Sequence, residues 1–314
     1  MRVVFLGNAP SSVPSLEALA ASSHELALVA TRVARPAGRG SQLVRTPVAE
    51  AADRLGLPLI ETETVKSGDG FAAVNALSPD VVAVVAYGEI LPLEVLEIPA
   101  VAPVNVHFSL LPKFRGAAPV QRAIIEGESV TGVTTIRMDE GMDSGPILLQ
   151  AEEPIRDDDD AGTLAGRLAT LGGPLLVETL DGVEAGAIRE RPQDDAGATY
   201  APKLKPGDRI IQWDLPAEGI TRLIRAMAPE PGAQTMFRGK ILKVFRASRG
   251  SASSDQRPPA PGEIVVASND ELVVATGGGV LRLDEVAPEG RKRMSGADFV
   301  RGYHPKTGEV LGEV

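Results

Sequence analysis

The sequence predicts an α/β protein with a parallel sheet in its N-terminal part and a smaller β-barrel in its C-terminal part. In the first 150 residues, short apolar runs alternate with amphipathic stretches, which is typical of sheets built from strand–helix–strand units. Beyond residue 206, short strand-like runs follow one another with turn residues between them. At 314 residues the chain is also long enough for about two domains.

The N-terminal part begins with Arg2–Gly7, a continuous apolar run ending in glycine, as expected of a buried parallel strand. Further strands are predicted at residues 25–31, 57–60, 80–86 and 103–107. Helices are predicted at residues 14–21, 47–55 and 70–77. Right-handed crossovers between such elements give a parallel sheet with helices on both faces, and ligands bind beyond the carboxyl ends of its strands.

The next segment predicts a hairpin. Residues 118–126 are expected to form a helix, and the β-branched run at 131–138 a strand that pairs with residues 146–155. A long helix is predicted over residues 162–180, with an interruption at Gly172-Gly173-Pro174.

Near residues 186–206 the apolar periodicity is lost and Gly, Pro and Asp become frequent, which indicates a domain boundary. We therefore expect an N-terminal domain over residues 1–186, a linker over 187–206 and a C-terminal β-barrel domain over 207–314. The strands of this barrel are predicted at residues 240–246, 262–267, 271–276 and 279–283.

The composition excludes several classes of site. The chain has no cysteine, so disulfides, thiolate metal sites and cysteine nucleophiles are excluded. It has three histidines, His24, His107 and His304, so we expect no histidine-rich metal site and no metal. The first residues predict a strand and not a signal peptide, and no apolar run approaches the roughly 20 residues of a membrane span. We therefore expect a cytoplasmic monomer without membrane contact.

The net charge of −10 argues against general nucleic-acid binding, but the charge is unevenly distributed. Residues 151–198 carry twelve acidic and four basic side chains, whereas residues 203–257 carry eleven basic and five acidic ones. A second basic segment, residues 32–45, holds four arginines and no acid. Such zones are compatible with a polyanionic partner that touches particular surfaces, and equally with ordinary solvated charge.

Two motifs that would suggest other functions are incomplete. The first strand is followed by Gly7-Asn8-Ala9-Pro10, where proline replaces one of the free backbone amides that bind a dinucleotide phosphate. The run of residues 157–160, four aspartates, lacks the alternating ligands, glycine and distant glutamate of a calcium loop. We expect it to be an acidic turn before a helix, whose N-terminus favours negative charge.

The most informative segment is residues 104–121. Asn105 and His107 are two positions apart at the end of a predicted strand, so their side chains point to the same face. Asp143 lies in a glycine-bounded turn after another strand and can fold back toward the same edge. An amide, an imidazole and a carboxylate at this edge favour a catalytic site, whereas an isolated histidine would more simply be a structural core residue.

At these residues the sequence resembles the folate-dependent formyltransferases. The segments that carry the resemblance are Asn105-Val-His107, Ser109-Leu-Leu-Pro112, Arg115-Gly116 and Asp143-Ser-Gly145. The resemblance implies that Asn105, His107 and Asp143 are the catalytic residues. It implies 10-formyltetrahydrofolate as the formyl donor, bound without a metal. The residues that it implies in contact with the folate are Ser109, Leu110, Leu111 and Pro112.

Three further features are similar to the members of that superfamily that act on methionyl-tRNA. Arg35-Pro-Ala-Gly-Arg-Gly40 resembles a loop that these members place on the tRNA acceptor arm, with Arg39 at its key position. Residues 86–92 are similar to theirs, and residues 199–295 resemble their OB-type β-barrel. The resemblance thus implies a Rossmann-like catalytic domain, a tRNA-binding barrel, and formylation of methionyl-tRNA for translation initiation.

The sequence also departs from that family. Its members usually carry Gly-Thr-Pro near position 8, and often two lysines where this chain has Ser41-Gln42, a change that removes positive charge from the expected tRNA loop. Two alternatives stay open. In one, the formyl acceptor is an amino sugar nucleotide or another small amine. In the other, the chain is a non-catalytic RNA-binding protein on the same scaffold.

Overall fold

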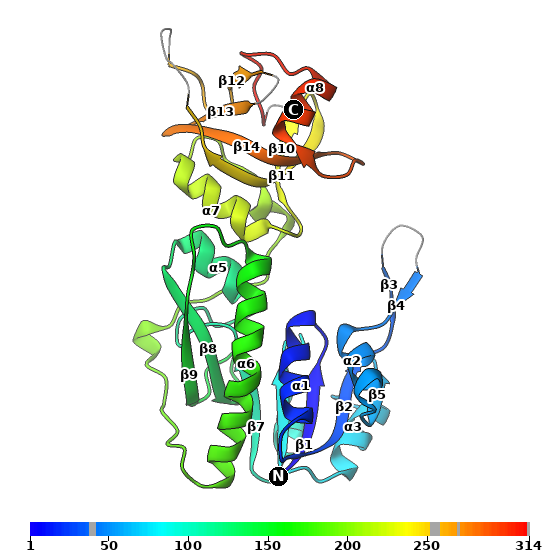
Figure 1. The fold of residues 1–314 in the computed structure, drawn as a ribbon. Coiled ribbons are helices and arrows are strands. Elements are labelled where there is room, and N and C mark those ends of the chain that lie inside the picture. Colours follow the sequence, from blue (N-terminus) through cyan, green and yellow to red (C-terminus); the bar gives the residue numbers. More distant parts are fainter. Residues whose placement is uncertain (38–41, 252–257, 269–270, 313–314) are drawn as a thin grey trace. The chain divides into compact units, whose positions relative to one another are not determined.

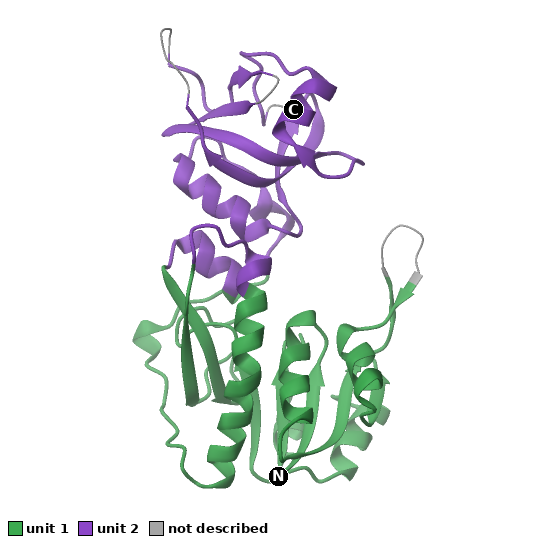
Figure 2. Ribbon diagram, in the orientation of Figure 1, with its two compact units in different colours: residues 1–119, 129–155, 165–203 green, residues 120–128, 156–164, 204–314 purple. Residues whose placement is uncertain are grey.

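The computed structural model (Figure 1) describes residues 1–37, 42–251, 258–268 and 271–312. The chain divides into two compact units (Figure 2). Unit 1 comprises Met1–Pro119, Ser129–Ile155 and Ala165–Lys203, and unit 2 comprises Val120–Glu128, Arg156–Leu164 and Leu204–Val314. Residues 120–128 and 156–164 thus belong to unit 2, although they lie within the expected N-terminal domain of residues 1–186. Among the described residues, no helix combines the length and apolar character that crossing a membrane requires.

Unit 1 is built on a seven-stranded sheet with the order β5-β2-β1-β6-β7-β8-β9. Its strands are β1 (Arg2–Gly7), β2 (Glu25–Arg32), β5 (Leu59–Thr62), β6 (Val81–Val85), β7 (Ala102–His107), β8 (Val130–Arg137) and β9 (Ile147–Pro154). The first five pair in parallel, whereas β8 runs antiparallel to both β7 and β9. The sheet is therefore mixed: the five strands predicted to be parallel are parallel, and the predicted hairpin forms β8 and β9, whose short connection makes them antiparallel to each other.

The centre of this sheet is formed by β1 and β6. The side chains of residues 3–6 and 81–83 are completely buried, as expected for strands covered on both faces. The strand order places β1 between β2 and β6, so the direction of winding reverses between β1 and β6. In sheets of this kind ligands bind beyond the carboxyl ends of the strands at such a reversal.

Short helices connect these strands. They are η1 (Pro10–Ser12), α1 (Val13–Ala20), α2 (Pro47–Leu55), α3 (Gly68–Ala76) and α4 (Leu93–Leu96). The bounds of α2 follow from its sequence. The Thr46 hydroxyl accepts a hydrogen bond from the Ala49 N–H at 3.0 Å, Pro47 occupies the first turn, and Gly56 ends the helix at a φ of 66°.

The long helix α6 (Ala161–Glu184) is continuous, which corrects the interruption predicted at Gly172-Gly173-Pro174. A Cβ on Gly173 would lie 2.8 Å from the carbonyl oxygen of Pro14 in α1. A Cβ on Gly172 would lie 3.2 Å from Cγ1 of Val106 in β7. The glycine pair therefore allows close packing of α6 rather than breaking the helix.

The basic segment of residues 32–45 contains a small two-stranded sheet. In it β3 (Arg35–Ala37) pairs antiparallel with β4 (Gln42–Val44). Arg39, the residue predicted to contact tRNA, lies outside the described residues.

Unit 2 contains an antiparallel sheet with the order β10-β11-β14-β13-β12, and β15 pairs with β14. Its strands are β10 (Ala233–Phe237), β11 (Lys240–Arg249), β12 (Ile264–Ala267), β13 (Leu272–Thr276), β14 (Gly279–Pro288) and β15 (Met294–Ser295). The four strands predicted from the sequence correspond to β11 through β14. The short edge strands β10 and β15 were not predicted.

Apart from the first turn of α6, three α-helices of the described residues contribute to unit 2. They are α5 (Pro119–Glu126), α7 (Ala217–Met227) and α8 (Gly296–Tyr303). α7 was not predicted from the sequence, although its buried residues Ile220, Ile224 and Met227 recur at helical spacing. The core of the unit includes Phe299 of α8, whose ring centroid lies 5.2 Å from that of Phe237 in β10.

The segment predicted as a linker, residues 187–206, pairs with unit 1 in its first part. It contains η2 (Asp195–Gly197) and is followed by η3 (Pro206–Arg209). Arg191 and Ile147 exchange two backbone hydrogen bonds of 2.8 and 2.9 Å. Arg115 donates its backbone N–H to Thr199 at 2.9 Å and accepts one from Ala201 at 2.7 Å. These bonds hold the segment beside the start of β9 and beside the loop that follows β7.

Candidate active site

A cavity of about 520 Å³ lies in unit 1, beyond the carboxyl ends of β6 and β7. Three segments line it: the turn after β6, the end of β7 with the loop that follows, and the connection between β8 and β9. The lining residues are 86–91, 105–108, 116, 117, 119, 136 and 138–143. This position is typical of ligand sites in open α/β sheets.

Asn105 and His107 reach the cavity from the last residues of β7. Their spacing of two residues places both side chains on one face of the strand, as predicted. His107 is only 6% exposed, whereas Asn105 is half-buried. Hydrogen-bonded neighbours on both sides, β6 and β8, fix the backbone from which the two side chains project.

The carboxylate of Asp143 lies against both of these side chains. Its Oδ1 accepts a hydrogen bond from Asn105 Nδ2 at 3.3 Å, and its Oδ2 lies 3.5 Å from Nδ1 of His107. Oδ2 also accepts a hydrogen bond from the backbone N–H of Gly116 at 2.8 Å. The structure therefore brings the three residues predicted to be catalytic together around one carboxylate.

The turn that presents Asp143 is held by specific contacts. Asp143 has a φ of 52°, a left-handed conformation that aspartate tolerates better than most residues. A side chain at Gly145 would collide with the carbonyl oxygen of Arg137. Gln193 donates through Nε2 to the carbonyl oxygens of Asp143 and Gly145, each at 2.7 Å. These contacts orient the carboxylate toward β7.

Gln193 fixes the Asp143 turn and was not predicted from the sequence. Its Oε1 accepts a hydrogen bond from Arg115 Nε at 3.0 Å, so the Gln193 amide joins the Asp143 turn to the loop after β7. Arg115 is only 4% exposed, and its guanidinium also pairs with Asp195 at 2.9 Å. Gln193 lies in a segment without periodicity, so no local pattern distinguishes it.

The two nitrogens of the His107 ring have different partners. Nε2 lies 2.9 Å from the carbonyl oxygen of Phe114, which can only accept, so Nε2 carries a hydrogen and donates it. Nδ1 faces Asp143 and is the nitrogen that can take up or release a proton. When both nitrogens carry protons, the Asp143 carboxylate compensates the charge of the ring.

The four residues predicted to contact the folate do not line the cavity. Ser109 is completely buried, and its hydroxyl donates to the carbonyl oxygen of Lys113 at 2.6 Å. Leu111 packs in a small apolar cluster with Ile136 and Ile147. The other two are half-buried. Two of the four side chains thus hold the loop in place from within.

The turn of residues 86–91 forms a largely apolar wall of the cavity. Tyr87 is 2% exposed, and its burial, reinforced by the charge of Glu89, raises the pKa of its hydroxyl to about 12, so the group stays protonated at neutral pH. Ile90 is 71% exposed and Met142 is 53% exposed. Exposed apolar side chains beside a cavity suit a ligand with a flat apolar part.

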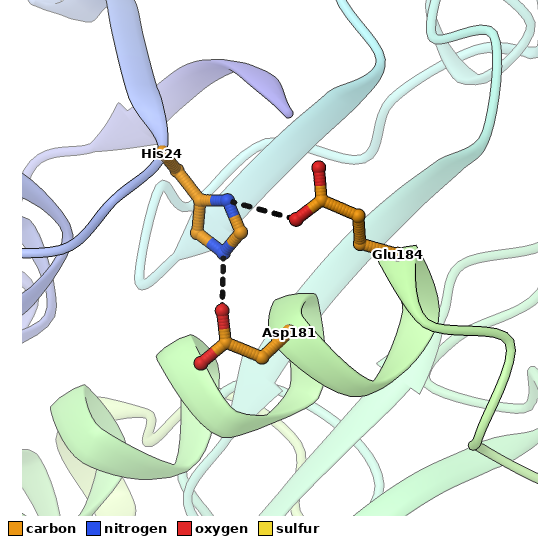
Figure 3. Close-up of side chains that lie close together, drawn as sticks. All are labelled: His24, Asp181 and Glu184. Carbon is orange, nitrogen blue, oxygen red and sulfur yellow. Dashed lines mark ion pairs between the residues drawn. The ribbon is translucent and has the colours of Figure 1, made fainter.

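Within the described residues, His24, Asp181 and Glu184 form the one cluster with the composition of a metal site (Figure 3). Asp181 Oδ1 lies 3.2 Å from Nε2 of the ring, and Glu184 Oε2 lies 3.9 Å from Nδ1. The carboxylates thus face opposite nitrogens of one imidazole, whereas a metal ion bound by this histidine would use a single nitrogen. The arrangement is better explained as a structural tie between the start of β2 and α6.

The arginines of the basic segment that the structure describes are paired with carboxylates. The pairs are Arg32 with Glu89, Arg35 with Glu63, and Arg45 with Glu61 and Asp53. Arg35 and Glu63 are 57% and 70% exposed, so solvent screens their attraction. Exposed pairs of this kind contribute little and can exchange one anion for another.

The sequence matches two family models. The formyl transferase model matches residues 1–180, and the formyl transferase C-terminal domain model matches residues 203–304. Together these matches span most of the chain and include Asn105, His107 and Asp143.

Full-length relatives are similar to this chain. The methionyl-tRNA formyltransferase of Pelotomaculum thermopropionicum is 44% identical over 313 residues, which cover 100% of this chain and 99% of the relative. That of Streptomyces griseus is also 44% identical over 313 residues, with 99% and 100% covered. Among solved structures, HypX from Aquifex aeolicus in complex with tetrahydrofolic acid has a TM-score of 0.65 at 17% identity. That match covers 98% of this chain and 48% of HypX.

Proposed function

Since this chain belongs to the formyl transferase family, we propose that it transfers the formyl group of 10-formyltetrahydrofolate to the amino group of methionyl-tRNA. The observation that carries the proposal is the convergence of Asn105, His107 and Asp143 on one cavity. The product would be the formylated initiator tRNA of translation. We expect the enzyme to act in the cytoplasm as a monomer.

Asn105 is suited to stabilise the developing oxyanion. When the amine attacks the formyl carbon, the carbonyl oxygen gains negative charge. The Asn105 amide has two N–H hydrogens, and one of them is directed at Asp143. The second can be donated to the formyl oxygen, and a fixed donor of this kind is typically worth ~10²–10³-fold in rate.

His107 and Asp143 are suited to move the proton that the reaction transfers. The attacking amine must lose one proton, and the departing folate nitrogen must gain one. Nδ1 of His107 can accept and return this proton, because Nε2 is engaged with Phe114. Asp143, 3.5 Å from Nδ1, keeps the ring oriented and balances its charge while it is protonated.

The formyl donor would occupy the cavity with its flat ring system against the wall of residues 86–91. The tetrahydrofolic acid in HypX supports a folate as the ligand of this fold. Leu110 and Pro112 are half-buried and do not line the cavity, so we propose that they contact the part of the donor that extends beyond it. Ser109 and Leu111 would then act through the backbone that they hold in place.

The tRNA would be bound through its phosphates. We propose that Arg39 contacts the acceptor end and that the antiparallel sheet of unit 2 is an OB-type barrel that binds the acceptor arm. Four cations of β11 support this assignment, since none forms an ion pair with another described residue: Lys240, Lys243, Arg246 and Arg249. Binding through such cations should weaken as salt is raised.

The direct test is transfer of labelled formyl from 10-formyltetrahydrofolate to methionyl-tRNA by the purified chain. We expect acid-stable label on the tRNA at a rate that depends on both substrates. Parallel incubations with an amino sugar nucleotide and with another small amine test the alternative acceptors. Label on these compounds and none on methionyl-tRNA would contradict the proposal, and no transfer to any acceptor would favour a non-catalytic RNA-binding protein.

A further inference from the structure

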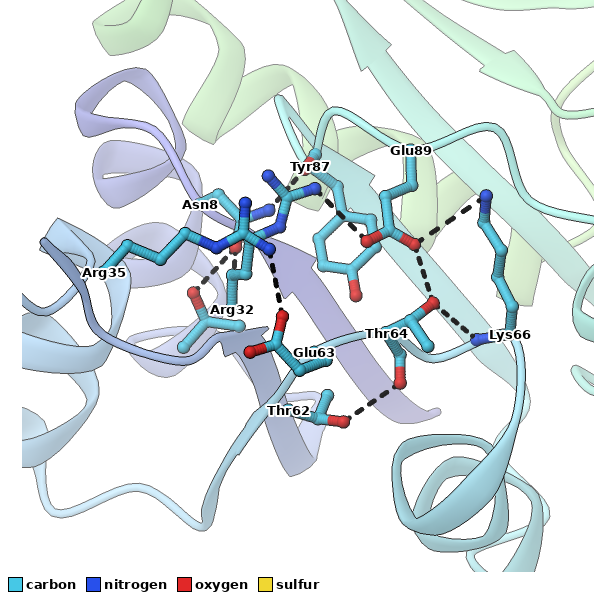
Figure 4. A network of polar contacts seen from close by, with 10 residues as sticks. Asn8, Arg32, Arg35, Thr62, Glu63, Thr64, Lys66, Tyr87 and Glu89 are labelled. Carbon is cyan, nitrogen blue, oxygen red and sulfur yellow. Dashed lines mark hydrogen bonds and ion pairs between the residues drawn. The ribbon is translucent and has the colours of Figure 1, made fainter.

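A polar network joins the carboxyl ends of β1, β2 and β6 next to the cavity (Figure 4). Its hub is Asn8, directly after β1. The Asn8 amide nitrogen donates to the carbonyl oxygen of Tyr87. Its Oδ1 accepts hydrogen bonds from Thr31 Oγ1 at 2.9 Å and from the Arg32 backbone N–H at 2.8 Å. One side chain therefore fixes the end of β2 to the turn after β6.

A nearly buried carboxylate makes the second link between these elements. The Glu89 side chain is 12% exposed and accepts a hydrogen bond from Arg32 at 3.2 Å. It also accepts a hydrogen bond from the Thr64 hydroxyl at 2.9 Å, and Nζ of Lys66 lies 3.9 Å from its Oε2 (Figure 4). Because Glu89 is largely shielded from water, solvent screens the Arg32–Glu89 pair less than it screens the exposed Arg35–Glu63 pair.

The turn that the network holds has an unfavourable backbone conformation. Ala86 has a φ of 44° and Gly88 a φ of 80°. A residue other than glycine rarely adopts such a φ unless the surrounding structure imposes it. Residues 86–89 all line the cavity, so any relaxation of this turn changes the shape of the cavity wall.

We propose that Asn8, Arg32 and Glu89 are positioning residues for the formyl donor. Asn8 and Arg32 do not line the cavity, so they act on the donor through the main chain of residues 86–89. The assignment rests on the proposed function, in which the donor binds against this wall. It also gives a role to the asparagine at position 8, which directly follows β1. The asparagine amide donates a hydrogen bond to Tyr87 through its nitrogen and accepts hydrogen bonds from β2 through its oxygen.

Steady-state kinetics of Asn8→Ala, Arg32→Gln and Glu89→Gln test the assignment, with 10-formyltetrahydrofolate and methionyl-tRNA as substrates. Each variant should raise the KM for the donor by about ten-fold, the effect of losing a hydrogen bond to a charged or buried group. The kcat at saturating donor should fall by no more than about two-fold. The Arg32→Gln/Glu89→Gln double variant should be no worse than the worse single variant, because the two residues form one link.

Glu63→Gln is the matched control, since Glu63 pairs with Arg35 in the same segment but does not line the cavity. Its donor KM should equal that of the wild type. Thermal melts identify any variant that loses the fold. If a single variant does, the double variant, which leaves neither Arg32 nor Glu89 as a charge without its partner, is measured in its place. A donor KM within two-fold of wild type in Glu89→Gln or Arg32→Gln would overturn the proposal, as would additive effects in the double variant.

The same variants separate this inference from the proposed function. If the wild type transfers no formyl group to methionyl-tRNA, the proposed function fails, and the affinity for tetrahydrofolate can still be measured by calorimetry. A weaker affinity for tetrahydrofolate in Asn8→Ala and Glu89→Gln, with an unchanged affinity in Glu63→Gln, would support the positioning role. Equal affinities in all four proteins would refute it.

Discussion

The residues around Asp143 and the basic segment of residues 32–45 belong to the same unit but are held in different ways. Asp143 is fixed by short contacts to β7 and to Gly116, and its turn is fixed by Gln193. In the basic segment, Arg35 and its partner Glu63 are mostly exposed and form a single ion pair. Transition-state stabilisation requires donors that are already in place, whereas attraction of a polyanion requires only charge of the right sign. In the proposed function, the groups that would act on the formyl group are therefore pre-organised, whereas the Arg35 side chain, in the segment that would attract the tRNA, is not.

The largest effect should come from removing the groups that we propose to act on the reacting atoms. Asn105→Ala and His107→Ala should each lower kcat by about 10²–10⁴-fold, because the oxyanion donor or the proton carrier is lost. The KM for methionyl-tRNA should change little. Formylation assays under saturating substrate measure both parameters. Asn75→Ala, on the exposed face of α3, is the control, and a kcat near the wild-type value for His107→Ala would contradict its role.

A smaller loss should follow from moving Asp143 without removing it. Gly145→Ala introduces a side chain that collides with the Arg137 carbonyl oxygen, so the turn must shift. We expect kcat to fall by roughly 10²-fold, the usual result of misplacing a catalytic group by about 1 Å. Gly166→Ala in α6 is the control, because a Cβ there has no heavy atom within 4 Å. Equal activity of the two variants would show that the turn tolerates displacement.

Substitution of Arg39 in the basic segment should change the KM for methionyl-tRNA and leave kcat unchanged. Arg39→Ala should raise the KM for methionyl-tRNA by about ten-fold and leave the donor KM unchanged, since one phosphate contact is lost. Arg54→Ala removes an arginine from α2, 59% exposed and paired with Glu17, and serves as the control. If Arg39→Ala matches this control in both KM values, Arg39 does not contact the tRNA.

Ionic strength should distinguish the two regions without any substitution. Raising salt from about 50 to 150 mM should increase the KM for methionyl-tRNA by more than about ten-fold, because several phosphate contacts release counterions. The donor KM should change less than about two-fold, since the proposed donor contacts are largely apolar and buried. Initial rates at several salt concentrations give both values. Parallel changes in the two KM values would mean that the regions do not differ in this way.

The parts of the fold with strong local patterns were predicted well. Continuous apolar runs identified β1 and β6, and proline with the apolar spacing identified α2 within its observed bounds. The spacing of two residues predicted that Asn105 and His107 lie on one face of the strand. The glycine-bounded turn predicted that Asp143 folds back toward the same edge. The interruption predicted in α6 was wrong, because glycines that permit close packing look the same in sequence as glycines that break a helix.

The sequence could not reveal contacts between distant segments. Gln193 reaches the Asp143 turn across 50 residues, and Asn8 reaches Tyr87 across 79 residues. Neither contact leaves a periodic or spaced pattern. The inward orientation of Ser109 and Leu111 was equally hidden, since it depends on a carbonyl oxygen and an apolar cluster that only the folded chain assembles.

Single-turnover formylation of methionyl-tRNA by Asp143→Ala, His107→Ala and the double variant tests most directly whether the groups around Asp143 act as one unit. Each single variant should be slowed at least about 100-fold, and the double variant should be scarcely slower than the worse single one. Rates for Asp143→Ala close to the wild type, or losses that multiply in the double variant, would contradict it.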